Sequence, residues 1–427
     1  MHQRERAGRR LRHHRQGARH RRRGRRVSSP PVNVLLRNRD FRRLWLSRSV
    51  SYIGDGIALI ALVLYVKSTE HSGIAVAALL LAQALPHLLG PVTGTFVDRV
   101  NLKRLMVACE FGQAIIFTAI ALWQPSFLVL LGLVVAAAVL DTTFGPASGS
   151  AVPALVAAPD LMQANAWLGS SLNLQVAIGP LLGGALTAGL GPRWALGANA
   201  VSFAISAALL AGLPKTMRVA ARSGSGILSD GLEGLRFAWR QPVIRSLMLG
   251  TFLLVAFVAV DNVALVFLTR DVLGLNAFGY GAVAATFGVG MLAGSVVLSW
   301  MRSVPRSAPL LLSAWLMSGV SALATGLAPN AGLAAGAQSV GGLGNGIQNV
   351  ASSTLIQQLV PREMLGRAFG LFGTTASAGS TVAYILAGVL LDVTSPRVTF
   401  VVGGLGGLAV LLAFGPTVWR AASRRTV

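Results

Sequence analysis

Long apolar runs alternate with short polar stretches along most of this chain. A helix needs about 20 mostly apolar residues to cross the hydrocarbon core of a bilayer, and twelve runs approach that length. The predicted spans are 44–66, 73–97, 105–123, 126–148, 165–189, 194–213, 246–268, 277–300, 308–327, 331–355, 366–391 and 398–416. The sequence therefore predicts an all-α membrane protein with twelve transmembrane helices.

An internal repeat divides these helices into two sets of six. A shift of 204 residues places Gly184 on Gly388 and Pro192–Arg193 on Pro396–Arg397, with no gap from Leu155 onward. It also carries the fifth span onto the eleventh. Two parallel six-helix halves are the architecture of a large class of secondary transporters, in which the substrate site lies between the halves near the membrane midplane.

The predicted organisation follows from this repeat. It comprises a basic, disordered N-terminal arm (1–32), an N-terminal half (33–213), a cytoplasmic linker (214–245), a C-terminal half (246–416) and a cytoplasmic tail (417–427). Within the linker, the stretch 227–239 is either an interfacial helix or a solvated segment.

Basic residues indicate the orientation. When alternate loops are assigned to opposite sides of the membrane, one side has only Lys67, Arg193, Arg270 and Arg397, and the other side has the remaining 33 of the 37 Lys and Arg residues. Arg48 is counted with that larger group. Basic loops stay in the cytoplasm, so both termini are predicted to be cytoplasmic in a multi-pass cell-membrane protein.

The first 26 residues contain twelve arginines and raise the net charge to +23. Such an arm suits anionic lipid headgroups beside a membrane helix, and we favour lipid over nucleic acid as its partner. An equally weighted interpretation is that the arm is translated upstream sequence and that the native start lies near Val27.

Composition argues against an enzyme. The chain is 53% hydrophobic and 12% charged, with a mean hydropathy of +0.64, whereas a soluble domain is about one quarter charged. The sequence has no phosphate-binding loop, no metal-ligand spacing and a single cysteine, Cys109. We predict no catalytic site, no cofactor and no metal.

Four acids lie inside predicted spans, where ionisable groups are costly and usually functional. Asp55 is near the middle of the first span, and Asp261 is at nearly the equivalent place in the second half. Burial disfavours the charged form of a carboxyl, so it can take up and release a proton near neutral pH. We predict proton coupling at Asp55 and Asp261, which line one cavity from opposite sides in this interpretation, with a structural hydrogen bond as the alternative for each. Asp141 and Glu110 are interpreted as structural.

Other polar groups inside the spans predict a polar substrate cavity. His87 follows Pro86 and has an ordinary titration range near neutral pH. Each of these groups is individually more often a hydrogen bond between helices than a ligand contact. The cavity candidates are Gln83, His87, Asp141, Asn165, Asn173, Gln175, Asn262, Asn345, Gln348 and Asn349.

The loop after the second span concentrates charge in the stretch GTFVDRVNLKRLM (94–106). This stretch is similar to the loop signature of the major facilitator superfamily, with Asn101 and Leu102 in place of the usual glycine and arginine. The segments 146–186 and 359–372 resemble the branch that contains the enterobactin exporter and macrolide efflux proteins. The resemblance implies a gating loop made of Gly94, Asp98, Arg99, Lys103 and Arg104. The alternative is a basic cluster that only fixes topology.

The fifth span contains Gly179, Pro180, Gly183 and Gly184, which match the end of the superfamily's antiporter signature. The resemblance implies a hinge in this helix, with a plain packing motif as the alternative. Many proton-coupled members have an arginine on the fourth helix, and the span 126–148 has none.

The resulting hypothesis is a monomeric secondary transporter that exports a lipophilic drug, macrolide or siderophore in exchange for protons. A proton-coupled uptake symporter for a nutrient and a non-transporting membrane receptor remain as alternatives.

Overall fold

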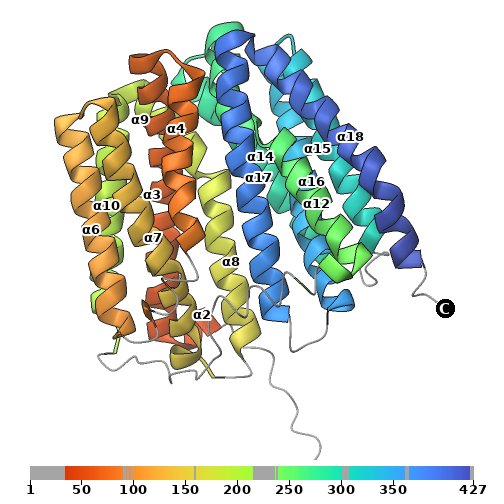
Figure 1. Ribbon diagram of the computed structural model, residues 1–427. Helices are drawn as coiled ribbons and strands as arrows, with labels where there is room; N and C mark the ends of the chain where they lie inside the picture. The colour runs from red at the N-terminus through yellow and green to blue at the C-terminus, as the bar shows by residue number, and fades with distance from the viewer. Residues whose placement is uncertain are drawn as a thin grey trace, which may run out of the picture.

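The computed structural model describes residues 34–89, 93, 96–97, 100–157, 160–214, 236, 239–300, 307–360 and 365–423. Gly94, Asp98 and Arg99 of the predicted gating loop lie outside these residues, as do the basic arm and nearly all of the linker. The described chain forms a bundle of long helices, drawn from red to blue in Figure 1.

The N-terminal half contains the short helix α2 and six helical segments that fit the first six predicted spans. They are α2 (Val34–Arg37), α3 (Arg39–Glu70), α4 (Gly73–Ala84) with the 3₁₀ helix η1 (Leu85–Leu89), α6 (Leu102–Trp123), α7 (Phe127–Leu155), α8 (Leu161–Ala177) with α9 (Gly179–Leu190), and α10 (Pro192–Ala211).

The C-terminal half repeats this arrangement. Its segments are α12 (Pro242–Val258) with α13 (Asp261–Phe267) and the π-helical turn η3 (Leu268–Val272), α14 (Ala277–Trp300), α15 (Ser307–Leu327), α16 (Ala331–Leu359), α17 (Leu365–Val393) and α18 (Pro396–Ser423). Figure 1 shows the two halves side by side, with α2 and the chain's C-terminus at the same end of the bundle.

The predicted all-α, two-half fold is confirmed. Within the described residues, ten helices are long and apolar enough to cross a membrane. The α4–η1 segment is shorter and the glycine-rich α16 is less apolar; with them the bundle fits the twelve predicted spans. The last helix continues to Ser423, beyond the predicted end at 416.

Local sequence signals explain where the helices begin and end. The side chain of Asn38 accepts hydrogen bonds from Asp40 N and Phe41 N at the start of α3, and Asn101 caps α6 in the same way. His71 and Gln124 end α3 and α6 in the left-handed conformation, with φ of 53° and 46°. These caps satisfy backbone groups that a helix end leaves unpaired.

The second span differs from its prediction. The expected helix ran from 73 to 97, but α4 ends at Ala84 and continues as η1. Pro86 lacks an N–H and cannot donate to the helical ladder, which accounts for the change to a tighter helix. Consequently His87 lies on a short 3₁₀ segment, not on a regular helix.

The two halves meet along two pairs of helices. The α8–α9 segment packs against α14, and α4 packs against α17. Gly184 of α9 faces Gly281 of α14, whereas its repeat equivalent Gly388 of α17 faces Ala77 of α4. Glycine allows the helices to approach closely at both interfaces, so the sequence repeat reappears as a symmetric contact between the halves.

Candidate functional site

A cavity of about 310 Å³ lies inside the N-terminal half. The carboxyl groups of Asp55 and Asp141 line it together with apolar side chains such as Phe117 and Leu59. Small-molecule sites are mostly apolar clefts of roughly 300–1,000 Å³ with a few placed polar groups. The full lining is Tyr52, Asp55, Ala58, Leu59, Gln83, His87, Gln113, Phe117, Val134, Ala137, Ala138, Asp141, Leu172 and Gln175.

Close packing encloses Asp55 on α3. Gly56, one residue later, packs so tightly that a Cβ atom there would lie 2.8 Å from the Cα of Gly179. Gly54, one residue earlier, faces Asn199 and Ser202 of α10. The two glycines therefore allow α9 and α10 to close around this part of α3, and Asp55 itself lines the cavity.

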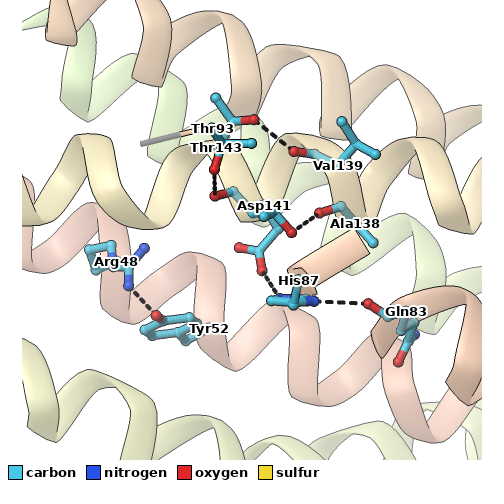
Figure 2. Close-up of polar contacts among 10 residues, drawn as sticks. Arg48, Tyr52, Gln83, His87, Thr93, Ala138, Val139, Asp141 and Thr143 are labelled. Carbon is cyan, nitrogen blue, oxygen red and sulfur yellow. Dashed lines mark hydrogen bonds and ion pairs between the residues drawn. The ribbon is translucent and has the colours of Figure 1, made fainter. Parts of the chain in front are cut away.

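His87 and Asp141 join η1 to α7 at the wall of the same cavity (Figure 2). His87 Nε2 lies 3.2 Å from Asp141 Oδ2, and His87 Nδ1 lies 2.9 Å from the backbone oxygen of Gln83. Both side chains are partly exposed, by 48% for His87 and 37% for Asp141, and both line the cavity.

Arg48, which the charge count grouped with the cytoplasmic basic residues, also belongs to the predicted first span, 44–66. It lies within α3, where its guanidinium donates a hydrogen bond to the Tyr52 hydroxyl and lies 5.1 Å from the centre of the Phe144 ring of α7. Arg48, Tyr52 and Asp55 are spaced four and three residues apart, which places them along one face of a helix. This spacing can be read from the sequence, but a count of basic residues does not use it.

Glu110 on α6 is fully buried. Neither of its carboxyl oxygens has a hydrogen-bond partner within the described part of the chain. Arg48 lies close enough to act on the charges of both Glu110 and Asp55. Arg48 and Glu110 therefore lie near the ionisable residues that line the cavity, which are Tyr52, Asp55, His87 and Asp141.

Asp261 has different surroundings in the C-terminal half. Gln338 of α16 donates a hydrogen bond of 2.9 Å from Nε2 to Asp261 Oδ1. The cavity beside Asp261 measures about 50 Å³. Asp55 and Asp261 were expected to face one common cavity, but the structure places them at two separate ones, because each carboxyl group is enclosed by helices of its own half.

The predicted cavity residues are divided by the structure. Gln83, His87, Asp141 and Gln175 line the larger cavity, and Asn345 lines the smaller one. Asn349 donates a hydrogen bond of 3.1 Å to Asn345. Neither cavity is lined by Asn165, Asn173, Asn262, Gln348 or Asn349.

The described part of the predicted gating loop makes contacts within its own half. Lys103 Nζ donates a hydrogen bond of 2.6 Å to the backbone oxygen of Leu213, which follows α10. The backbone N–H of Arg104 donates to the Asn101 side chain at 3.1 Å. These contacts fix the start of α6 against the end of α10.

The fifth span is interrupted at the predicted hinge position. α8 ends at Ala177 and α9 begins at Gly179, with Ile178 between them and Pro180 in the first turn of α9. Proline removes a backbone donor from the helical ladder. Gly183 packs against Ile57 of α3, so the same glycine-rich stretch also serves close packing.

Polar contacts join the two halves at the end of the bundle opposite the termini (Figure 1). Lys67 of α3 pairs with Asp271 of η3 at 2.6 Å. Asp392 of α17 accepts hydrogen bonds from Ser72 Oγ at 2.8 Å and from Gly73 N at 2.6 Å, at the start of α4. None of these contacts was predicted, although Lys67 and Asp271 are separated by the repeat length of 204 residues.

Comparisons with known proteins agree with this architecture. The family model described as "Transmembrane secretion effector" matches residues 34–422. The chain is 23% identical to macrolide efflux protein A of Streptococcus pyogenes, over 82% of this chain and 89% of that protein. It is 26% identical to the enterobactin exporter of Citrobacter koseri, over 90% of this chain and 94% of that protein.

Solved structures share the fold at lower identity. The crystal structure of the nucleoside transporter NupG superimposes with a TM-score of 0.71 at 13% sequence identity, covering 89% of this chain and 99% of that chain.

Proposed function

Because the chain belongs to the transmembrane secretion effector family of major facilitator transporters, we propose that it exports a lipophilic small molecule in exchange for protons. The carboxyl group of Asp55 at the wall of the 310 Å³ cavity is the observation that carries this proposal. Desolvation disfavours the charged form of a carboxyl, and a ligand in the cavity would lie against that group. Proton and substrate can then compete for the same space, which is the requirement of an exchanger.

Asp261 is proposed as a secondary coupling site. Its carboxylate already accepts a hydrogen bond from Gln338, which favours its charged form. Its cavity is also much smaller. Asp55 therefore has the leading role in proton exchange in this proposal, and Asp261 the lesser one.

Alternating access accounts for the contacts between the halves. Lys67–Asp271 and the Asp392 hydrogen bonds close one end of the bundle, so opening that end requires these contacts to break. The predicted gating loop, from Gly94 to Arg104, would act at the other end, and the break at Ile178 would provide the hinge. The proton gradient supplies about 2.3 kcal/mol per charge for each 100 mV of membrane potential.

The basic residues support a cytoplasmic location for both termini. Lys67 and Arg270 lie at the end of the bundle opposite the termini, near Asp271. The N-terminal arm is proposed to lie against anionic lipid headgroups. One chain contains both halves, which supports transport by a monomer.

The substrate class follows from the cavity and the relatives. The larger cavity combines apolar walls with a few polar groups, which favours a lipophilic molecule with some polar functions. The named relatives are a macrolide efflux protein and an enterobactin exporter, so a macrolide and enterobactin are the first probes to use.

Proteoliposomes with an imposed pH gradient test the proposal. If the protein is an exporter, protons flow down the imposed gradient when the probe is added on the cytoplasmic side, and Asp55→Asn abolishes this proton flow. An uptake symporter moves probe and protons in the same direction. A receptor binds the probe and moves neither, and this result would refute the proposed transport.

A further inference from the structure

A hydrogen bond between His87 and Asp141 needs one proton more than a neutral imidazole and a carboxylate supply. The backbone oxygen of Gln83 can only accept a hydrogen bond, so His87 Nδ1, at 2.9 Å, must carry the hydrogen. In a neutral imidazole, Nε2 is then an acceptor. A carboxylate oxygen is also an acceptor, so the 3.2 Å contact between Nε2 and Oδ2 is a hydrogen bond only when one proton sits on either atom.

The pair lies at a short segment that touches both halves. η1 packs against α7 of its own half and against α17 of the other half. The adjoining α4 is fixed to α17 at its far end by Asp392. At the other end of α4, the contact between His87 of η1 and Asp141 of α7 links η1 to the N-terminal half.

Several other ionisable groups surround the pair. α3 contributes Tyr52, Asp55 and Arg48, and α6 contributes Glu110. On α17, Arg367 lies outside the side chains that the structure describes; the described titratable side chains are Tyr384 and Asp392, and Asp392 is engaged at the far end of α4. Around the pair, the described part of the N-terminal half therefore places two further acids, Asp55 and Glu110, and one arginine, Arg48.

We propose that His87 and Asp141 form a proton-binding site, separate from Asp55, whose shared proton holds η1 against α7. When the proton leaves to water, a neutral imidazole and a carboxylate remain, and their lone pairs face each other. The hydrogen bond is lost and η1 is released from α7. This site deepens the proposed proton exchange, because it gives the proton a direct effect on a segment that contacts both halves.

Hydrogen–deuterium exchange of the full-length protein in detergent tests the site without measuring transport. The readout is amide protection of the peptide that covers η1, corrected for the intrinsic dependence of exchange on pH. In the wild-type protein, protection at about pH 6 is expected to exceed that at about pH 8.5 by roughly tenfold, the effect of losing one charge-assisted hydrogen bond.

Two variants keep the hydrogen bond but remove the need for a shared proton. In Asp141→Asn the amide donates to neutral Nε2, and in His87→Gln the amide donates to the Asp141 carboxylate. Protection of η1 is then expected to be the same at both pH values. Asp261→Asn, the matched substitution in the other half, should retain the wild-type pH response.

Equal protection of wild-type η1 at both pH values would overturn the proposal. So would a wild-type pH response in both Asp141→Asn and His87→Gln. A protein that shows the expected exchange pattern but moves no probe in proteoliposomes would retain this proton site and lose the proposed transport function.

Discussion

The two halves place a carboxyl group at nearly equivalent points of the repeat and then surround it differently. Asp55 faces a cavity of about 310 Å³ that also contains Asp141 and His87. Asp261 faces a cavity of about 50 Å³ and accepts a hydrogen bond from Gln338. The backbone differs as well, because α3 runs unbroken through Asp55, whereas α12 ends at Val258 and α13 begins at Asp261.

Both carboxyl groups lie beside a side-chain amide, Asn199 for Asp55 and Gln338 for Asp261, so the difference is the second acid and the histidine at the cavity of Asp55. An amide donor satisfies a carboxylate without taking part in proton transfer. A second acid and a histidine, in contrast, give the proton alternative positions. The comparison therefore assigns the main chemical role to the N-terminal half and a more structural role to the C-terminal half.

Replacing the N-terminal carboxyl group gives the largest expected effect. Asp55→Asn should lower gradient-driven transport of the macrolide probe roughly 100-fold, in the range expected when a proton-transfer group is lost. Probe binding should change much less, because the amide keeps the size and polarity of the side chain. Transport into inside-out vesicles and equilibrium binding to the purified protein measure the two effects separately.

Substitution at the glycine contact tests the symmetric part of the comparison. A Cβ at Gly184 would lie 2.8 Å from the backbone oxygen of Ala277, and one at Gly388 would lie 2.8 Å from Ala77 Cβ. Gly184→Val should destabilise the protein by about 1–3 kcal/mol through overpacking, and Gly388→Val should act in the same direction. Gly189→Val is the control, since no atom lies within 4 Å of its Cβ position on the same helix. Thermal unfolding in detergent reports the change, and equal melting of the Gly184 and Gly189 variants would refute the close contact.

Arg48 gives the next expected effect, which is specific to the N-terminal half. Arg48→Gln should lower transport about tenfold, because it removes the positive charge that lies near Asp55 and Glu110. Arg48→Lys keeps the charge and should recover part of the activity. Initial transport rates at several pH values measure this. Identical rates for the wild type, Arg48→Gln and Arg48→Lys would remove Arg48 from the mechanism.

The contacts between the halves give the smallest expected effect. Asp392→Asn removes a charged acceptor from Ser72 and Gly73, so the open form of this end should become roughly threefold more populated. Distances between spin labels at positions 68 and 272 measure the opening. Asp160→Asn, which weakens the ion pair with Arg37 within one half, should leave these distances unchanged.

The sequence predicts the fold well because span length and the positive-inside rule depend on composition along the chain. It also identifies Asp55 and the Gly184–Gly388 equivalence. It does not identify the His87–Asp141 pair, because the two residues are 54 positions apart and each alone resembles a structural polar group. The charge count gave Arg48 no role of its own, because its contact with the Phe144 ring depends on packing that the sequence does not show.

Some features depend on contacts between helices that no local pattern specifies. Pro86 is a signal in the sequence for the η1 segment. The contact between η1 and α17 has no such signal. The separate cavities arise from how each half encloses its own carboxyl group. Repeat symmetry in the sequence therefore predicted one shared cavity where the structure has two.

The most direct test compares Asp55→Asn and Asp261→Asn in the same assay. Both variants are reconstituted in liposomes containing a pH-sensitive dye, and proton movement is recorded when the macrolide or enterobactin probe is added. We expect Asp261→Asn to move protons at a rate within about threefold of the wild type, and Asp55→Asn to move none above the protein-free background. Proton movement that persists in Asp55→Asn and disappears in Asp261→Asn would contradict the assignment of proton exchange to the N-terminal half.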